Sequence, residues 1–100
     1  MTKLNGGQLI EKVFEKEGVK YIFGIPGGHI YPMMESCDEN GIKFIGTRHE
    51  MNAAFMAEGW ALTTGQVGVC TGTAGPGFTN LITGVANASA NCVPMLCMGG

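Results

Sequence analysis

Short apolar runs alternate along the chain with stretches in which apolar residues recur at helical spacing. The first such stretch is a stripe near the N-terminus, made of Leu9, Ile10, Val13 and Phe14. Asn5 is placed to cap the start of this helix, and Gly18 is placed to end it. Further helices are predicted over residues 30–40, 49–64 and 78–90, the first two of these followed by Gly41 and Gly65. Four apolar runs predict strands over residues 21–25, 43–46, 67–70 and 93–98.

The predicted strands are nearly continuous apolar runs rather than alternating ones, which is typical of strands covered on both faces. Strands and helices follow one another regularly, and this rhythm implies right-handed crossovers between parallel strands. We therefore expect an α/β fold, a doubly wound parallel sheet with helices on both faces. No helix follows the last predicted strand before Gly99 and Gly100. On this ground, residues 1–100 are expected to be the N-terminal part of something longer.

The composition is apolar for so short a chain. Of its 100 residues, 45% are hydrophobic and 14% are charged. A chain of this size cannot cover so much apolar surface well, so part of that surface is expected to meet another domain or subunit. The net charge of -2 and the lack of a basic cluster argue against nucleic acid as a partner. No apolar run is long enough to span a membrane, and the N-terminus lacks the pattern of a secretory signal.

The four cysteines lack the spacing of a metal site. Cys37, Cys70, Cys92 and Cys97 form no C-x-x-C pair and have no histidine at ligand spacing. No metal site is therefore predicted in these residues. Cys70 and Cys97 fall within apolar runs and are expected to be buried as small hydrophobic residues. Cysteines in this role favour a reducing, cytoplasmic location.

Candidate chemistry gathers at one edge of the predicted sheet, because ligands of doubly wound folds bind beyond the carboxyl ends of the strands. Four segments follow those ends, at residues 26–29, 47–50, 71–77 and 99–100. Tight turns account for the glycines among them but not for Glu50. Glu50 opens an otherwise apolar helix. It is either a favourable partner of the helix dipole or a functional carboxylate.

The glycine-rich turn at residues 72–77 suggests a phosphate cradle at a helix N-terminus. As a dinucleotide fingerprint it is poor, because Asn80 stands where the third glycine belongs. No Gly-Lys-Ser or Gly-Lys-Thr follows, which excludes a P-loop. Pro76 also removes an amide donor that a phosphate would use. A turn that admits something flat and closely packed fits better.

Four stretches, in order, carry a family likeness across nearly the whole chain. They are Gly18 to Gly28, Arg48 to Ala61, Thr63 to Val69, and Gly75-Pro76-Gly77 with Asn80. Together they resemble the acetolactate synthase and benzaldehyde lyase-like superfamily of thiamine-diphosphate enzymes. The resemblance implies the thiamine-diphosphate-binding fold, with residues 1–100 as the N-terminal part of its pyrimidine-binding domain.

The same resemblance implies roles for individual residues. Glu50 matches the glutamate that activates the cofactor through a hydrogen bond to N1′ of its aminopyrimidine. The presence of this glutamate argues against glyoxylate carboligase, a branch that lacks it. Pro26, Gly27 and Gly28 match a loop beside the active site. The turn that packs around the pyrimidine and the partner subunit is matched by Thr73, Gly75, Gly77 and Asn80.

A finer likeness points in two directions. Residues 27–30 and 73–80 resemble loops of benzaldehyde lyase, in which the counterpart of His29 is an active-site residue. Residues 80–84 and the Gly99-Gly100 ending resemble catabolic acetolactate synthases instead. The implied reaction makes or breaks a C–C bond next to a carbonyl, on a 2-oxo acid or an aldehyde. The alternative from another class is a non-catalytic α/β ligand-binding or assembly domain, in which Glu50 is only a helix-start charge.

The family holds Mg²⁺ and the diphosphate of the cofactor through a Gly-Asp-Gly motif with a downstream Asn. Asp38 is the single aspartate of this chain and has no glycine beside it. The Mg²⁺ site and the middle and diphosphate-binding domains are therefore expected outside these residues. By resemblance, the diphosphate is held by a second subunit of a homodimer or homotetramer. Several members also keep FAD, whose site would again lie outside this segment.

Overall fold

A four-stranded parallel sheet forms the centre of the structure, a computed structural model that describes residues 3–100. The strands are β1 (Tyr21–Gly24), β2 (Lys43–Gly46), β3 (Gly68–Gly72) and β4 (Met95–Gly99), in the order β2-β1-β3-β4. The longer helices are α1 (Gly6–Lys16), α2 (Tyr31–Glu39), α3 (Glu50–Thr64) and α5 (Ile82–Ala90). Two short elements lie between them, the 3₁₀ turn η1 (Gly28–Ile30) and the one-turn helix α4 (Pro76–Thr79). The chain leaves β1 for β2 on one side and then returns to β3 on the other, so the ligand crevice of such a fold falls between β1 and β3.

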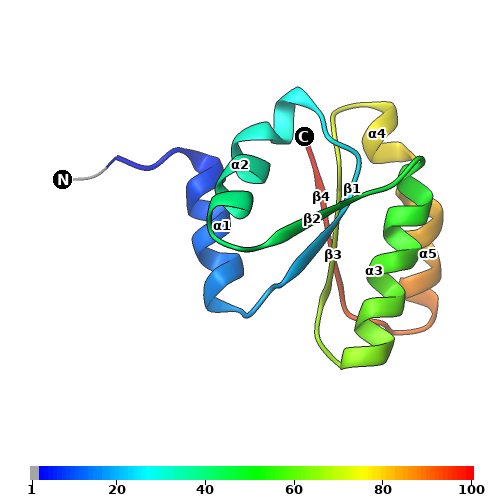
Figure 1. Ribbon diagram of the computed structural model, residues 1–100. Helices are drawn as coiled ribbons and strands as arrows, with labels where there is room; N and C mark the ends of the chain where they lie inside the picture. The colour runs from blue at the N-terminus through cyan, green and yellow to red at the C-terminus, as the bar shows by residue number, and fades with distance from the viewer. Residues whose placement is uncertain (1–2) are drawn as a thin grey trace.

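Helices cover both faces of the sheet, with α1 and α2 on one side and α3 and α5 on the other (Figure 1). The first core consists of Phe14, Ile22, Ile30, Met33, Cys37, Ile42 and Val69. The second core consists of Phe23, Ala53, Ala54, Ala57, Cys70 and Leu81. Ile22 and Phe23 are neighbours in β1 but belong to different cores, because side chains alternate along a strand. The predicted doubly wound α/β fold is confirmed.

Only the central strands are well buried. All five residues of β3 are buried, whereas the border strands β2 and β4 are a mixture of half-buried and exposed residues. Cys70 in β3 is buried as predicted, while Cys97 in β4 is only partly buried. The prediction of strands covered on both faces is therefore right for the middle of the sheet and wrong for its borders. A border strand has a neighbour on one side only, and the helices cover mainly the middle of each face.

Helix α1 begins as its sequence indicates. The Asn5 side chain accepts a hydrogen bond from the Gln8 N–H, and the Gln8 side chain accepts one from the Asn5 N–H, both at 2.8 Å. This reciprocal capping box satisfies two amide donors that the first turn of a helix leaves free. Three of the predicted helix ends are also confirmed, since Gly18, Gly41 and Gly65 all have positive φ.

The buried side of α1 is not the predicted apolar stripe. Glu11 and Phe14 are the buried residues, while the rest of the stripe is exposed (Leu9, Ile10 and Val13). The cause lies at Gly7, where a Cβ would collide with the backbone of α2 at Pro32 and Met33. This close approach sets the rotation of α1 and turns most of its stripe outward. Glu11 is carried inward by the same rotation, and its Oε1 has no hydrogen-bond partner among residues 3–100.

The helix predicted over residues 78–90 is divided in two. Helix α4 begins at Pro76, a residue type favoured in the first turn, and ends after Thr79. Helix α5 begins only at Ile82. Leu81, between them, is fully buried in the second core. The interruption lets Leu81 enter the core while the preceding residue, Asn80, reaches α3.

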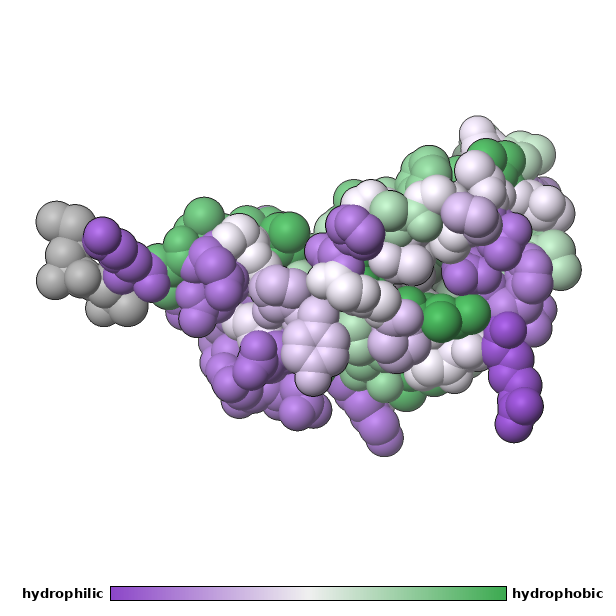
Figure 2. Space-filling model, turned by 90° about the horizontal axis from the view of Figure 1, so that it is seen from above, coloured by the Kyte–Doolittle hydropathy of each residue, from purple (hydrophilic) through white to green (hydrophobic). Residues whose placement is uncertain are grey.

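Apolar side chains reach the surface in several places. Those more than half exposed are Leu9, Val13, Tyr31, Leu62 and Ile82. Seen from above, hydrophobic patches lie among pale and hydrophilic residues rather than beneath a closed polar layer (Figure 2). Within residues 3–100 no helix is both long enough and apolar enough to cross a membrane.

Candidate functional site

Loops from separate strands meet above the carboxyl ends of the sheet, the upper edge in Figure 1. Thr73, which follows β3, lies at the centre of this meeting. Its side chain occupies the space that a Cβ on Gly27 would need, and its Oγ1 lies 3.5 Å from Nδ1 of His29. Its Cγ2 lies 3.0 Å from the Cβ position of Gly77. The structure thus brings together the predicted loops at residues 26–29 and 71–77.

Glu50 enters this region as the first residue of α3 and is only 8% exposed. The preceding residue, His49, caps the helix, because its Nδ1 accepts a hydrogen bond from the Met51 N–H at 3.0 Å. Thr47 Oγ1 donates to the His49 carbonyl at 2.9 Å and closes the turn. His49 is therefore occupied by helix capping, and this capped turn fixes where Glu50 leaves the backbone.

The two carboxylate oxygens of Glu50 have different surroundings. Asn80 Nδ2 donates a hydrogen bond to Oε1 at 3.1 Å. Oε2 lies 3.5 Å from the Cβ position of Gly77, and no hydrogen bond within residues 3–100 reaches it. A buried carboxylate is costly unless its oxygens find donors. Oε2 of Glu50 is not enclosed by the described part of the chain, so it remains accessible to solvent or to another hydrogen-bond donor.

His29 lies on the other side of Thr73 and is exposed. Together with Ile30, the first turn of α1 and the end of β4, it lines a cavity of about 420 Å³. Pro26 and Gly28 are exposed in the same loop, and Gly28 begins η1. Gly75 directly precedes α4 and has a φ of 69°, a backbone conformation that favours glycine. Its role is therefore to allow the turn.

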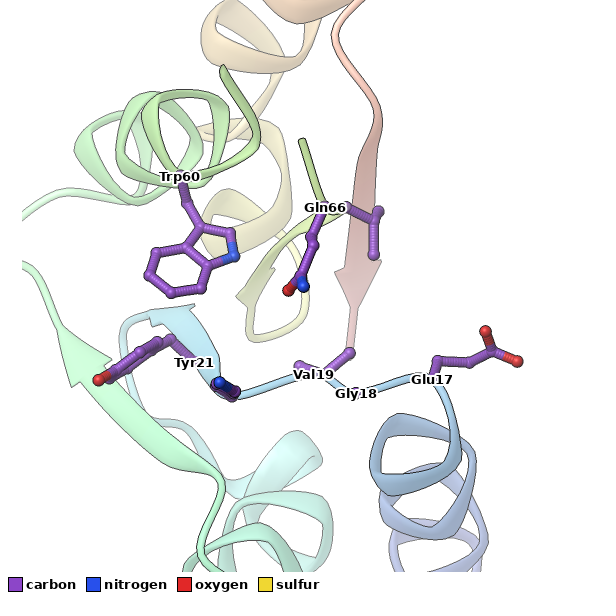
Figure 3. Close-up of a pocket in the computed structure, with 8 residues that line it drawn as sticks. Glu17, Gly18, Val19, Tyr21, Trp60 and Gln66 are labelled. Atoms are coloured by element: carbon purple, nitrogen blue, oxygen red, sulfur yellow. The ribbon is translucent and has the colours of Figure 1, made fainter. Parts of the chain in front are cut away.

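A second cavity, of about 320 Å³, lies at the opposite edge of the sheet (Figure 3). Its walls include Tyr21 and Trp60, whose rings meet edge to face with centroids 4.9 Å apart. The side chain of Gln66 lies beside them (Figure 3). Because β1 begins at Tyr21, this cavity is at the amino ends of the strands. Neither Glu50 nor His29 lines it, so it is separate from the candidate site.

The cysteines lie outside the candidate site. Burial, and to a smaller extent the nearby Glu11 carboxylate, raise the pKa of the Cys37 thiol to about 11. The pKa of the Cys70 thiol is raised too, by its interaction with the neighbouring Cys97 thiol and by burial, while the same interaction lowers the pKa of Cys97. Thiols held in the protonated form are poor nucleophiles and poor metal ligands. In the part of the chain that the structure describes, no three His, Cys, Asp or Glu side chains are grouped to hold a metal ion.

One feature of the structure was missed by the sequence reasoning, the contact between α3 and α5. Glu58 is 6% exposed, and Asn87 Nδ2 lies 2.9 and 2.7 Å from its two carboxylate oxygens. Nearer the site, a Cβ on Gly84 would overlap the Cβ of Ala54. The sequence held one indication of this contact, a second glutamate in the Ala-rich helix. Glu58 follows Glu50 by about two turns and therefore lies on a similar side of the helix.

The described residues thus form a parallel α/β domain with a mostly buried carboxylate at the carboxyl edge, where folds of this kind commonly bind small ligands or cofactors. A sequence profile described as "Thiamine pyrophosphate enzyme, N-terminal TPP binding domain" matches residues 4–100. The chain therefore belongs to the thiamine pyrophosphate enzyme family and matches its N-terminal, pyrimidine-binding domain.

Relatives of known name agree with this assignment. The chain is 44% identical over 96 residues to 2-hydroxyacyl-CoA lyase 2 of Mus musculus, covering 96% of the chain and 15% of that protein. It is 44% identical over 97 residues to the probable acetolactate synthase large subunit of Methanocaldococcus jannaschii, covering 97% and 16%. It is 41% identical over 97 residues to the acetolactate synthase isozyme 2 large subunit of Escherichia coli K12, covering 97% and 18%. The chain thus spans less than a fifth of the length of these relatives.

Proposed function

We propose that this chain is the pyrimidine-binding part of a thiamine-diphosphate enzyme that makes or breaks a C–C bond next to a carbonyl. Glu50 is the residue that activates the cofactor. The observation that carries the proposal is the position of Glu50: a nearly buried carboxylate at the carboxyl edge, with Oε1 bound by Asn80 and Oε2 free beside Gly77.

The residues around Glu50 fit a flat ring. Gly77 is buried, and a Cβ there would lie at a crowded 3.0 Å from Thr73 Cγ2 and at an ordinary contact distance of 3.5 Å from Oε2 of Glu50, so glycine leaves the space beside the carboxylate unfilled. Gly27 meets Thr73 from the other loop, which closes one side of that space. In this arrangement Oε2 can share a proton with a ring nitrogen at direct hydrogen-bond distance, the distance that proton transfer requires. When bound, thiamine diphosphate supplies a nucleophilic carbon at C2.

His29 is proposed to act on the substrate. Its ring lines the cavity beside the crevice, and a histidine is suited to relay a proton at neutral pH. The substrate is proposed to be a 2-oxo acid or an aldehyde, in keeping with the acetolactate synthases and the lyase among the relatives.

The other parts of the enzyme are also proposals. Mg²⁺ and the diphosphate are bound outside these residues, FAD is a further candidate cofactor, and the subunits form a homodimer or homotetramer. The exposed apolar side chains are consistent with such contacts. A cytoplasmic location is also proposed, and the four free cysteines are consistent with it.

The test compares two equivalent substitutions in the complete enzyme. Glu50→Gln keeps the shape of the side chain and one carbonyl oxygen but cannot accept a proton. It should slow deuterium exchange at C2 of the bound cofactor by roughly 10²–10⁴-fold, the scale of general acid–base catalysis. Glu58→Gln makes the same change two turns further along α3, at another buried glutamate, and should leave the exchange rate unchanged. If C2 exchange in Glu50→Gln equals that of the wild type, Glu50 is not the activating residue.

A further inference from the structure

Helices α3 and α5 are joined by two carboxylate–amide pairs. Asn80, just before α5, donates to Glu50, and Asn87, within α5, donates to Glu58. Glu50 and Glu58 are about two helical turns apart in α3, and the two asparagines on the facing segment have a similar spacing. Gly84 packs directly on Ala54 between the pairs, which brings the two helices as close as their backbones allow. The pairs are therefore held by the same helix–helix contact.

The two pairs differ in how much of the carboxylate they use. Asn87 Nδ2 lies within hydrogen-bond distance of both oxygens of Glu58, at 2.9 and 2.7 Å. Asn80 reaches only Oε1 of Glu50, at 3.1 Å. Glu58 is thus fully occupied within the fold. Glu50 is held by one oxygen, and the other faces the space kept open by Gly77.

We propose that Asn80 is a positioning residue: it holds Oε1 of Glu50 so that Oε2 points into the pyrimidine site. This inference rests on the proposed function of Glu50. It also changes the role that the family likeness gives Asn80, from packing around the cofactor to acting through the glutamate. The role needs a hydrogen-bond donor on a fixed backbone. The backbone of Asn80 is fixed by the interruption between α4 and α5, where its N–H donates to the Pro76 carbonyl at 2.9 Å.

Asparagine fits this task better than aspartate would. Its side-chain NH₂ donates to a carboxylate, whereas an ionised aspartate can only accept. A freely rotating glutamate would expose either oxygen, in several rotamers, to the site. With Oε1 bound, one orientation is retained before the cofactor arrives, so no reorganisation is needed when it binds.

The experiment uses the complete enzyme and four variants: Asn80→Asp and Asn80→Ala, with Asn87→Asp and Asn87→Ala as matched controls. Both Asn80 variants should slow C2 deuterium exchange by about tenfold to a hundredfold, the scale of one lost hydrogen bond to a charged group. Their affinity for thiamine diphosphate, measured by calorimetry, should change by less than about threefold, because the amide does not touch the cofactor. The Asn87 variants should exchange at the wild-type rate.

A second measurement does not depend on catalysis. In crystal structures of the cofactor-free enzyme, the Glu50 side chain should adopt a different rotamer, or several alternate conformations, in Asn80→Ala. It should keep its wild-type rotamer in Asn87→Ala. If the Asn80 variants show wild-type C2 exchange and an unmoved Glu50 side chain, the inference about Asn80 is wrong. The proposed function of Glu50 survives that result as long as Glu50→Gln slows C2 exchange. A loss of cofactor affinity as large as the loss of exchange also overturns it, since Asn80 would then contact the cofactor directly. If Glu50→Gln exchanges normally, the proposed function fails and the inference fails with it.

Discussion

Gly84 offers a quantitative test of the helix contact that positions Glu50. A Cβ at this position would overlap the Ala54 Cβ and press on the α3 backbone, so Gly84→Ala must push α5 away from α3. Overpacking of this kind typically costs about 1–3 kcal/mol. Part of this cost is offset because alanine has a higher helix propensity than glycine, by roughly 1 kcal/mol. The net result should be a loss of stability at the α3–α5 contact.

Gly59 provides the matched control. It lies within α3, is exposed, and a Cβ there would meet nothing within 4 Å. Gly59→Ala should therefore stabilise the helix by about 0.5–1 kcal/mol, the entropy that glycine loses on folding. The change from glycine to alanine should therefore lower stability at Gly84 and raise it at Gly59, in two neighbouring helices.

Hydrogen–deuterium exchange of the complete enzyme, read by mass spectrometry on peptides covering α3 and α5, measures this locally. A net cost of about 1–2 kcal/mol, after the gain in helix propensity, corresponds to protected amides that exchange about fivefold to thirtyfold faster in Gly84→Ala. In Gly59→Ala the same amides should exchange more slowly than in the wild type. If Gly84→Ala is as protected as Gly59→Ala, the two helices are not in backbone contact at this point, and the geometry argued for Asn80 loses its support.

Two further predictions concern His29 and the cysteines. His29→Ala should leave C2 exchange nearly intact and lower the rate of the carboligation or cleavage step, both measured on one preparation; unaffected turnover would make His29 structural. In the native protein at pH 8, iodoacetamide should label the exposed Cys92 and spare Cys37. With a pKa of about 11, only about one Cys37 thiol in a thousand is ionised at pH 8, so its labelling should rise as the pH approaches 11. Peptide mass spectrometry checks this, and rapid labelling of Cys37 at pH 8 would contradict the burial described.

The sequence predicted the order and type of the main elements because local signals were strong. The capping pair of Asn5 and Gln8 and the positive-φ glycines depend only on neighbours in the chain. Boundaries that depend on tertiary packing were less accurate. The last strand begins at Met95 rather than at residue 93, after a turn in which Cys92 has a φ of 53°. The outward rotation of α1 follows from its contact with α2 at Gly7, which no periodicity reveals.

The candidate site was predictable in its location but not in its contacts. Parallel topology alone places residues 26–29, 47–50 and 71–77 at one edge of the sheet. The bond from Asn80 to Glu50 requires the helix to break before α5, whereas the sequence predicted one continuous helix over residues 78–90. The role of His49 as a helix cap likewise depends on the orientation of its ring. The first contact arises from tertiary packing and the second from a local side-chain orientation. The family resemblance indicated which residues matter but not which hydrogen bonds they form.

The most direct test of the central claim is the distance between Glu50 and the pyrimidine in a crystal structure of the complete enzyme with thiamine diphosphate and Mg²⁺. Oε2 of Glu50 should lie within hydrogen-bond reach of N1′, about 2.6–3.2 Å, with Oε1 still bound by Asn80. A pyrimidine ring bound elsewhere, or one whose N1′ is paired with a different side chain, would contradict the claim that Glu50 activates the cofactor.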